Sequence, residues 1–205
     1  MKKNKKSIFI YFLEMLIVFI LIDGVITVLP SVISNNITYY KYGTELLLEI
    51  IYAALVLIVM LLFKNSYVFT AKKQKFVKSI TLGFPMLIIA AISLLGSLSS
   101  LDGFNFGNFI NLLLLTIFIG IAEEFLCRGW LQNEFIERYG DTKKHIVLSL
   151  LFSSLIFGLI HFSNMLAGQD LFTTIVQVIQ ATSAGLLLGS IYYKTKNIWA
   201  VIFLH

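Results

Sequence analysis

Long apolar runs, separated by short polar stretches, divide the chain into segments of membrane-spanning length. A hydrocarbon core of about 30 Å needs roughly 20 apolar residues in a helix. The predicted spans are 8–29, 45–63, 80–98, 108 into the 130s, 145–166 and 171–193, followed by a shorter apolar run at 198–205. The pattern therefore predicts an all-α fold, a polytopic transmembrane helix bundle of six full spans and a truncated seventh.

The composition agrees with this class. Of the 205 residues, 58% are apolar and 13% are charged, whereas a soluble domain averages roughly 45–50% apolar and about 25% charged. Too few polar side chains remain to cover a water-facing surface, which excludes a soluble enzyme and a DNA-binding domain. We therefore expect the lipid bilayer as a partner and no nucleic acid. Since no repeat or Pro/Gly linker divides the sequence, we expect a single domain over residues 1–205.

Positive charge alternates from loop to loop. The segments 1–6, 64–78, 129–144 and 194–197 carry 14 of the 16 lysines and arginines, whereas the segments 30–44, 99–107 and 163–170 carry Lys41 alone. Because positively charged loops tend to stay in the cytoplasm, this distribution places the N-terminus there. We expect a multi-pass cell membrane protein, and the Arg-poor composition, rich in Lys, Ile and Asn, suggests a bacterial plasma membrane.

Two adjacent glutamates lie deep in the fourth predicted span, in the segment Gly120-Ile-Ala-Glu123-Glu124-Phe-Leu-Cys-Arg128. Charged side chains are costly inside a membrane, so each needs an explanation. Arg128 stands four residues after Glu124, which puts the carboxylate and the guanidinium on one helix face. Glu123 points about 100° away from that pair, which makes it the candidate general base or acid. The alternative is a structural charge cluster that holds helices together.

Two histidines extend this set of candidates. Phe157 and His161 share a face of the fifth span, and His205 ends the last apolar run. The residues 139–142 form a predicted turn between the two helices. Glu123 and His161 each lie about 26 Å along a helix from this turn, so an antiparallel hairpin would place them at the same depth in the membrane. His205 lies about 14 Å in from the cytoplasmic face, the same depth if the hairpin tip projects about 12 Å into the cytoplasm. A carboxylate and two imidazoles can therefore converge inside the membrane. For His161 alone, a helix–helix hydrogen bond is the alternative.

In this order and spacing, the three motifs resemble those of the CPBP family of intramembrane proteases. These are the CAAX-processing and bacteriocin-processing enzymes, also called the Abi family. The resemblance covers 120–205 and rests on Glu123-Glu124 with Arg128, on Phe157 with His161, and on His205. The third motif of the family is His-xxx-Asn, and this sequence ends at its His. We therefore expect that the end of the family's core bundle is missing after His205.

The resemblance implies a role for each of these residues. Glu123 and His161 would position and deprotonate the attacking water, and His205 would stabilise the oxyanion. Three further residues would support them: Glu124, Arg128 and Phe157. In a zinc-dependent enzyme Glu123, His161 and His205 would instead be the metal ligands, since one Glu and two His form a catalytic zinc set. A metal-free glutamate mechanism stays open beside the zinc mechanism.

Two functions are consistent with the sequence. The first is an intramembrane metalloendopeptidase of the CPBP type that hydrolyses a peptide or protein substrate near the cytoplasmic face. A bacterial leader peptide, a peptide pheromone or a bacteriocin, cut for processing or self-immunity, is its expected substrate. The second is a non-catalytic bacteriocin-immunity or scaffold protein that binds its partner without cutting it. Replacing Glu123 separates the two, because binding would survive the change and hydrolysis would not.

Overall fold

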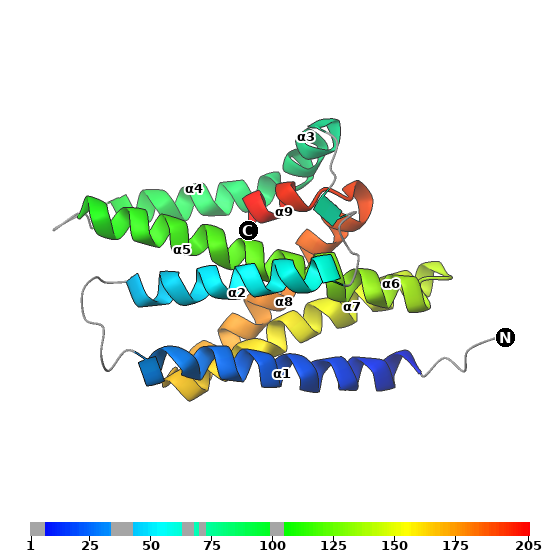
Figure 1. The fold of residues 1–205 in the computed structure, drawn as a ribbon. Coiled ribbons are helices and arrows are strands. Elements are labelled where there is room, and N and C mark those ends of the chain that lie inside the picture. Colours follow the sequence, from blue (N-terminus) through cyan, green and yellow to red (C-terminus); the bar gives the residue numbers. More distant parts are fainter. Residues whose placement is uncertain (1–6, 34–42, 63–67, 70–72, 99–104) are drawn as a thin grey trace. The chain divides into compact units, whose positions relative to one another are not determined.

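Every element that the structure describes is a helix (Figure 1). The computed structural model describes residues 7–33, 43–62, 68–69, 73–98 and 105–205. In chain order the elements are α1 (Ile8–Ile33), α2 (Gly43–Leu62), α3 (Lys73–Leu82), α4 (Phe84–Leu98), α5 (Phe106–Glu124), the π-helix η3 (Phe125–Gln132), α6 (Asn133–Tyr139), α7 (Lys143–Ile160), the 3₁₀-helix η4 (His161–Ala167), α8 (Leu171–Thr195) and α9 (Ile198–Leu204). The predicted all-α fold is therefore confirmed for the described residues.

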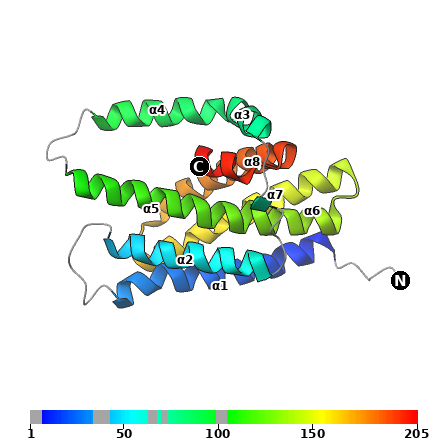
Figure 2. The ribbon, with the colours of Figure 1, turned by 45° about the horizontal axis from the view of Figure 1, so that its top comes forward.

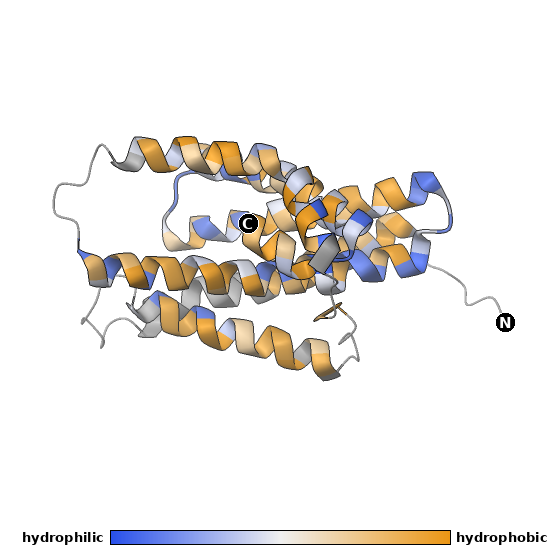
Figure 3. Ribbon diagram, turned by 90° about the horizontal axis from the view of Figure 1, so that it is seen from above, coloured by the Kyte–Doolittle hydropathy of each residue, from blue (hydrophilic) through white to orange (hydrophobic). Residues whose placement is uncertain are grey.

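Three helical stretches within the described residues are long and apolar enough to cross a membrane: Phe106–Tyr139, Lys143–Ala167 and Leu171–Thr195. A fourth is obtained if the bent pair of α3 and α4 counts as one span. In Figure 3 apolar residues run along the helices, and hydrophilic residues gather at helix ends, as at the turn between α6 and α7. The count of six full spans with a truncated seventh, and the cytoplasmic N-terminus, stay predictions.

The third predicted span, 80–98, is not one straight helix. α3 and α4 meet at Gly83 at an angle of 62°. Pro85 lacks a backbone N–H and disfavours helical geometry at the residue before it, which interrupts the ladder of hydrogen bonds. The chain passes the turn through two backbone bonds of 2.9 Å, from Gly83 N to Ser79 O and from Met86 N to Gly83 O. The sequence signal for the bend is the Gly-Phe-Pro run at 83–85, which a hydropathy pattern does not detect.

The chain forms two compact units, each assembled from two stretches of sequence. The first unit consists of Met1–Ile37 and Trp130–Ser190, and the second consists of Thr38–Gly129 and Ile191–His205. The sequence motifs are divided between them, since His161 belongs to the first unit and the glutamates belong with His205 to the second. The expected single domain over 1–205 stays a prediction.

In the first unit, α1 packs on α7 and η4, and α6 packs on α7. Aromatic side chains fill these contacts. Tyr11 of α1 lies edge-on to Phe135 of α6 with ring centroids 5.1 Å apart, and the rings of Phe12 and Phe152 lie 4.8 Å apart. α8 approaches α7 closely at Gly158, where an added Cβ would lie 2.8 Å from the Val178 carbonyl oxygen, because small residues let helix backbones approach one another.

In the second unit, α2 lies alongside α5, as Figures 1 and 2 both show, and α9 packs on α3 and α5. Met60 of α2 reaches η3. Its Cε lies 2.9 Å from the place that a Cβ would take on Gly129, so α2 and η3 approach each other closely at this point. The packing of α9 on α5 brings the end of the chain to the end of α5.

Candidate active site

A buried ion pair lies at the end of α5. Arg128 donates from Nη1 to Glu124 Oε1 at 2.7 Å, and the side chains are 2% and 0% exposed. The spacing of four residues keeps both on one helix face, although the π-helix η3 begins directly after Glu124. The predicted pairing of Glu124 with Arg128 is therefore confirmed. Such a pair can stay buried because each charge compensates the desolvation of the other.

His205 joins this cluster from the end of α9. Its Nδ1 lies 2.8 Å from Glu124 Oε1, the same oxygen that accepts from Arg128. Its Nε2 lies 3.5 Å from Glu123 Oε2. The imidazole ring thus stands between the two glutamates. Glu123 and His205 keep exposed fractions of 25% and 22%, so a small reactant can reach these two side chains but not Glu124.

Three contacts hold α9, and with it His205, in place. Asn197 caps the helix by accepting a hydrogen bond from the N–H of Ala200 at 3.0 Å, which satisfies one of the open donors of a helix N-terminus. The indole N–H of Trp199 donates to the Phe69 carbonyl at 3.0 Å. The ring of Trp199 also lies edge-on to Phe125, the residue after Glu124, with centroids 5.6 Å apart. α9 is therefore fixed directly to the segment that carries the glutamates.

The change from α-helix to π-helix after Glu124 is a feature that the sequence analysis did not predict. A π-helix adds a residue to each turn and occurs frequently at functional sites. The apolar spacing of this stretch does not distinguish the two helix types. The local geometry therefore agrees with a functional site at the end of α5, and this signal comes from the backbone.

His161, in the first unit, stands where α7 becomes the 3₁₀-helix η4. Its Nδ1 lies 2.8 Å from the Phe157 carbonyl oxygen, and the two rings are edge-on at a centroid distance of 5.3 Å. A carbonyl only accepts hydrogen bonds, so Nδ1 carries the proton. In the neutral ring Nε2 is then the nitrogen that can accept a hydrogen bond or a proton. Gln177 of α8 steadies η4 by accepting from Asn164 at 2.9 Å and from Gln169 at 2.8 Å.

The sequence-predicted residues therefore fall into two groups. Glu123, Glu124, Arg128 and His205 meet in the second unit. His161 belongs with Phe157 to the first unit. The convergence of His161 with Glu123 and His205 stays a prediction. His161 and His205 share one property. In each ring Nδ1 lies next to an oxygen acceptor, and Nε2 is on the opposite side of the ring.

Zinc needs a suitable donor set, and catalytic zinc in proteins takes three protein ligands beside an open position. The second unit offers Glu123 and His205 as neighbouring donors, while Glu124 is already held by Arg128. Among the described residues, no three His, Cys, Asp or Glu side chains form a group that could hold a metal ion. Within the second unit, Glu123 and His205 alone therefore do not complete a catalytic zinc set, and zinc binding stays a prediction.

The fold is thus that of a helical membrane protein with an acid–imidazole cluster at the end of one helix. Residues 105–205 match the model of the family described as type II CAAX prenyl endopeptidase Rce1-like, so this part of the chain is similar to a family of intramembrane endopeptidases. The predicted resemblance to the CPBP family is confirmed. No curated protein and no solved structure is significantly similar to the chain.

Proposed function

We propose that this protein is an intramembrane endopeptidase in which Glu123 activates the attacking water. The observation that carries the proposal is the 3.5 Å distance between Glu123 Oε2 and His205 Nε2, with both side chains partly accessible. A base and a hydrogen-bond donor must flank the reacting carbonyl, and in the absence of substrate such contacts are often long. The family match of residues 105–205 supports the same reaction.

In this mechanism Glu123 takes a proton from water while the water oxygen attacks the carbonyl carbon of the peptide bond. His205, protonated on both nitrogens, donates from Nε2 to the oxyanion that forms. The intermediate then collapses, the C–N bond breaks, and the Glu123 carboxyl returns its proton to the leaving amine. Arg128 and Glu124 do not touch the substrate and support His205 from the buried side.

His161 has a separate part in the proposal. The resemblance to the family gives it a share in positioning the water. Its Nδ1 is engaged by the Phe157 carbonyl, so it would accept from that water through Nε2. Zinc bound through Glu123, His161 and His205 is the competing proposal. Metal analysis tests it, because about one equivalent should then copurify and fall sharply in His161→Ala.

The proposed substrate is a small apolar peptide, such as a leader peptide, a pheromone or a bacteriocin, cut near the cytoplasmic face. The test is cleavage by the full chain in proteoliposomes, followed by mass spectrometry. Two probes are compared, an apolar membrane-anchored peptide without a lipid group and a farnesylated peptide that ends in a CAAX sequence. Cleavage of the unmodified probe is expected. Cleavage of the farnesylated probe alone would contradict the substrate class, and cleavage of neither would contradict the endopeptidase.

The alternative function is a non-catalytic immunity or scaffold protein. It predicts that Glu123→Gln leaves bacteriocin protection or partner binding unchanged. The proposal predicts instead that any protection that depends on this protein is lost with the same change. Cells that express wild type or Glu123→Gln at equal levels, exposed to the same bacteriocin, separate the two.

A further inference from the structure

Glu124 contacts His205 as well as Arg128, although the contact with Arg128 alone would balance the charge of the guanidinium. Its Oε1 accepts from Arg128 Nη1 at 2.7 Å and lies 2.8 Å from His205 Nδ1, and its side chain is fully buried. A carboxylate beside a guanidinium, which is always charged, can only accept hydrogen bonds. The ring nitrogen of His205 that faces Glu124 must therefore carry a proton.

This contact determines which nitrogen of His205 can react. The partner of one ring nitrogen fixes the protonation and the orientation of the other. With Nδ1 held by Glu124, Nε2 is directed to the side of Glu123, 3.5 Å from Oε2. His161 is anchored in the same way, because its Nδ1 donates to the Phe157 carbonyl at 2.8 Å.

We propose that Glu124 is a positioning residue that keeps a proton on Nδ1 of His205, in the neutral and in the charged ring, and thereby directs Nε2 to the reaction. The inference rests on the proposed function for what Nε2 does, but the protonation of Nδ1 is independent of it. Arg128 has a secondary part, since it fixes the Glu124 carboxylate that fixes the ring. Loss of the acceptor should release the ring without removing any group that touches the substrate.

The test is ¹⁵N NMR of the full chain in detergent micelles with ¹⁵N-labelled histidine rings. The sequence holds only three histidines, so His145→Gln and His161→Gln assign the signals. In wild type, His205 should carry a proton on Nδ1 at every pH measured. A ring that carries its only proton on Nε2 would overturn the proposal even if no variant folds.

Two variants separate positioning from charge. Glu124→Gln keeps an oxygen acceptor and should retain the Nδ1–H form. Glu124→Leu combined with Arg128→Leu removes acceptor and counter-charge together, a change that a buried pair often tolerates, and should move the proton to Nε2. An unchanged His205 spectrum in this double variant would contradict the proposal. His161 is the internal control and should not change. If the spectra behave as expected but wild type cleaves nothing, the proposed function fails and the positioning role stands.

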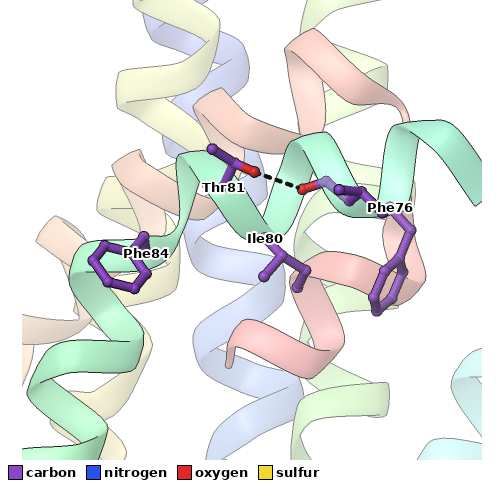
Figure 4. A pocket seen from close by; sticks show the side chains of 5 residues that line it. Phe76, Ile80, Thr81 and Phe84 are labelled. Carbon is purple, nitrogen blue, oxygen red and sulfur yellow. Dashed lines mark hydrogen bonds between the residues drawn. The ribbon is translucent and has the colours of Figure 1, made fainter.

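A different observation concerns α3 and the beginning of α4. An open apolar pocket of about 490 Å³ lies there, lined by Phe76, Val77, Ile80, Thr81 and Phe84 (Figure 4). Its one hydroxyl, on Thr81, donates to the Val77 carbonyl at 3.1 Å and is therefore satisfied within the helix. Val77 and Phe84 are 62% and 58% exposed. The pocket offers an apolar ligand a surface without competing polar groups.

Basic side chains lie on another face of the same helix. Lys75 and Lys78, both exposed, stand three residues apart and so share a face. Val77 and Ile80 are likewise three apart, on the face of the pocket. A short helix with one basic and one apolar face is typical of segments that lie in the membrane interface. The 62° bend at Gly83 turns this helix away from the apolar α4.

We infer that α3 lies in the interface and binds an anionic phospholipid, with acyl chains in the pocket and phosphates at Lys75 and Lys78. The test measures the melting temperature of the full chain in nanodiscs of phosphatidylcholine, with and without phosphatidylglycerol. The anionic lipid should stabilise wild type, and Lys75→Gln with Lys78→Gln should lose most of that gain. The matched control, Lys143→Gln with Lys144→Gln, should keep it. Equal losses in both pairs, or no gain in wild type, would overturn the inference.

Discussion

Nδ1 of His205 lies 2.8 Å from Oε1 of Glu124, and 81 residues of sequence separate the two. The contact joins the last residue of the chain to the one glutamate of the pair that is fully buried. It explains why two adjacent glutamates occur here, since one anchors the ring and the other faces its second nitrogen. Adjacent residues on a helix point about 100° apart, so neither Glu123 nor Glu124 can take the position of the other.

The buried pair should be sensitive to single changes and tolerant of a double change. Arg128→Leu leaves the Glu124 carboxylate buried without its guanidinium, which should cost about 3–5 kcal/mol of stability. Glu124→Leu with Arg128→Leu should restore most of the lost melting temperature. The matched control is Arg138→Leu, which breaks the exposed i, i+4 pair with Glu134 and should cost less than about 1 kcal/mol. Equal losses of stability from Arg128→Leu and Arg138→Leu would contradict the claim that burial makes the pair of Glu124 and Arg128 important for stability.

The cap of α9 should matter for activity as well as stability. Asn197→Ala removes the bond to the Ala200 N–H and should cost about 1 kcal/mol, with a lower cleavage rate because His205 ends this helix. Asn105 caps α5 in the same way, accepting from the Asn108 N–H at 3.0 Å, but at the opposite end from the glutamates. Asn105→Ala should therefore lower stability and leave the rate unchanged. Thermal melts and cleavage rates of both variants provide the check, and equal rate losses would count against the role of α9.

Close packing of α7 and α8 requires glycine at 158. An added Cβ would lie 2.8 Å from the Val178 carbonyl oxygen, a backbone atom that cannot rotate away, so Gly158→Ala should cost about 1–3 kcal/mol. Gly96, in α4, has no atom within 4 Å of the same position. Gly96→Ala should be neutral or slightly stabilising, since alanine favours a helix over glycine. Melting temperatures in one detergent compare the two, and a stable Gly158→Ala would show that the helices can move apart.

Orientation follows from the charge distribution and can be tested directly. A reporter fused after Lys73 should be cytoplasmic, and one fused after Asn36, which lies outside the described residues, should be external. The reason is that lysine-rich segments resist translocation. The reverse pattern would contradict the cytoplasmic N-terminus and the placement of the candidate site near the cytoplasmic face.

Much of this molecule could be predicted because its signals are local. Apolar runs of spanning length predicted the helices, and the i, i+4 spacing predicted the bond between Glu124 and Arg128. The same spacing placed Phe157 beside His161. Each of these depends on helix periodicity, which the sequence carries directly.

The rest depends on contacts and backbone geometry that periodicity does not encode. The bond from His205 to Glu124 joins residues 81 apart, and no local pattern selects that glutamate over Glu123. The π-helix after Glu124 and the 3₁₀ turn at His161 keep the apolar pattern of an α-helix, so hydropathy cannot reveal them. The bend at Gly83 has a local signal in Pro85, but the apolar run continues across it, so the hydropathy pattern predicts one straight span.

The most direct test of the central claim is the cleavage rate of Glu123→Gln beside that of Glu137→Gln. Glutamine keeps the shape of the side chain and removes the base, so Glu123→Gln should fold as well as wild type and lower the rate by about 10²–10⁴-fold. Glu137 is exposed on α6, and its glutamine variant should cleave at the wild-type rate. Near wild-type cleavage by a folded Glu123→Gln would contradict the claim that Glu123 activates the attacking water.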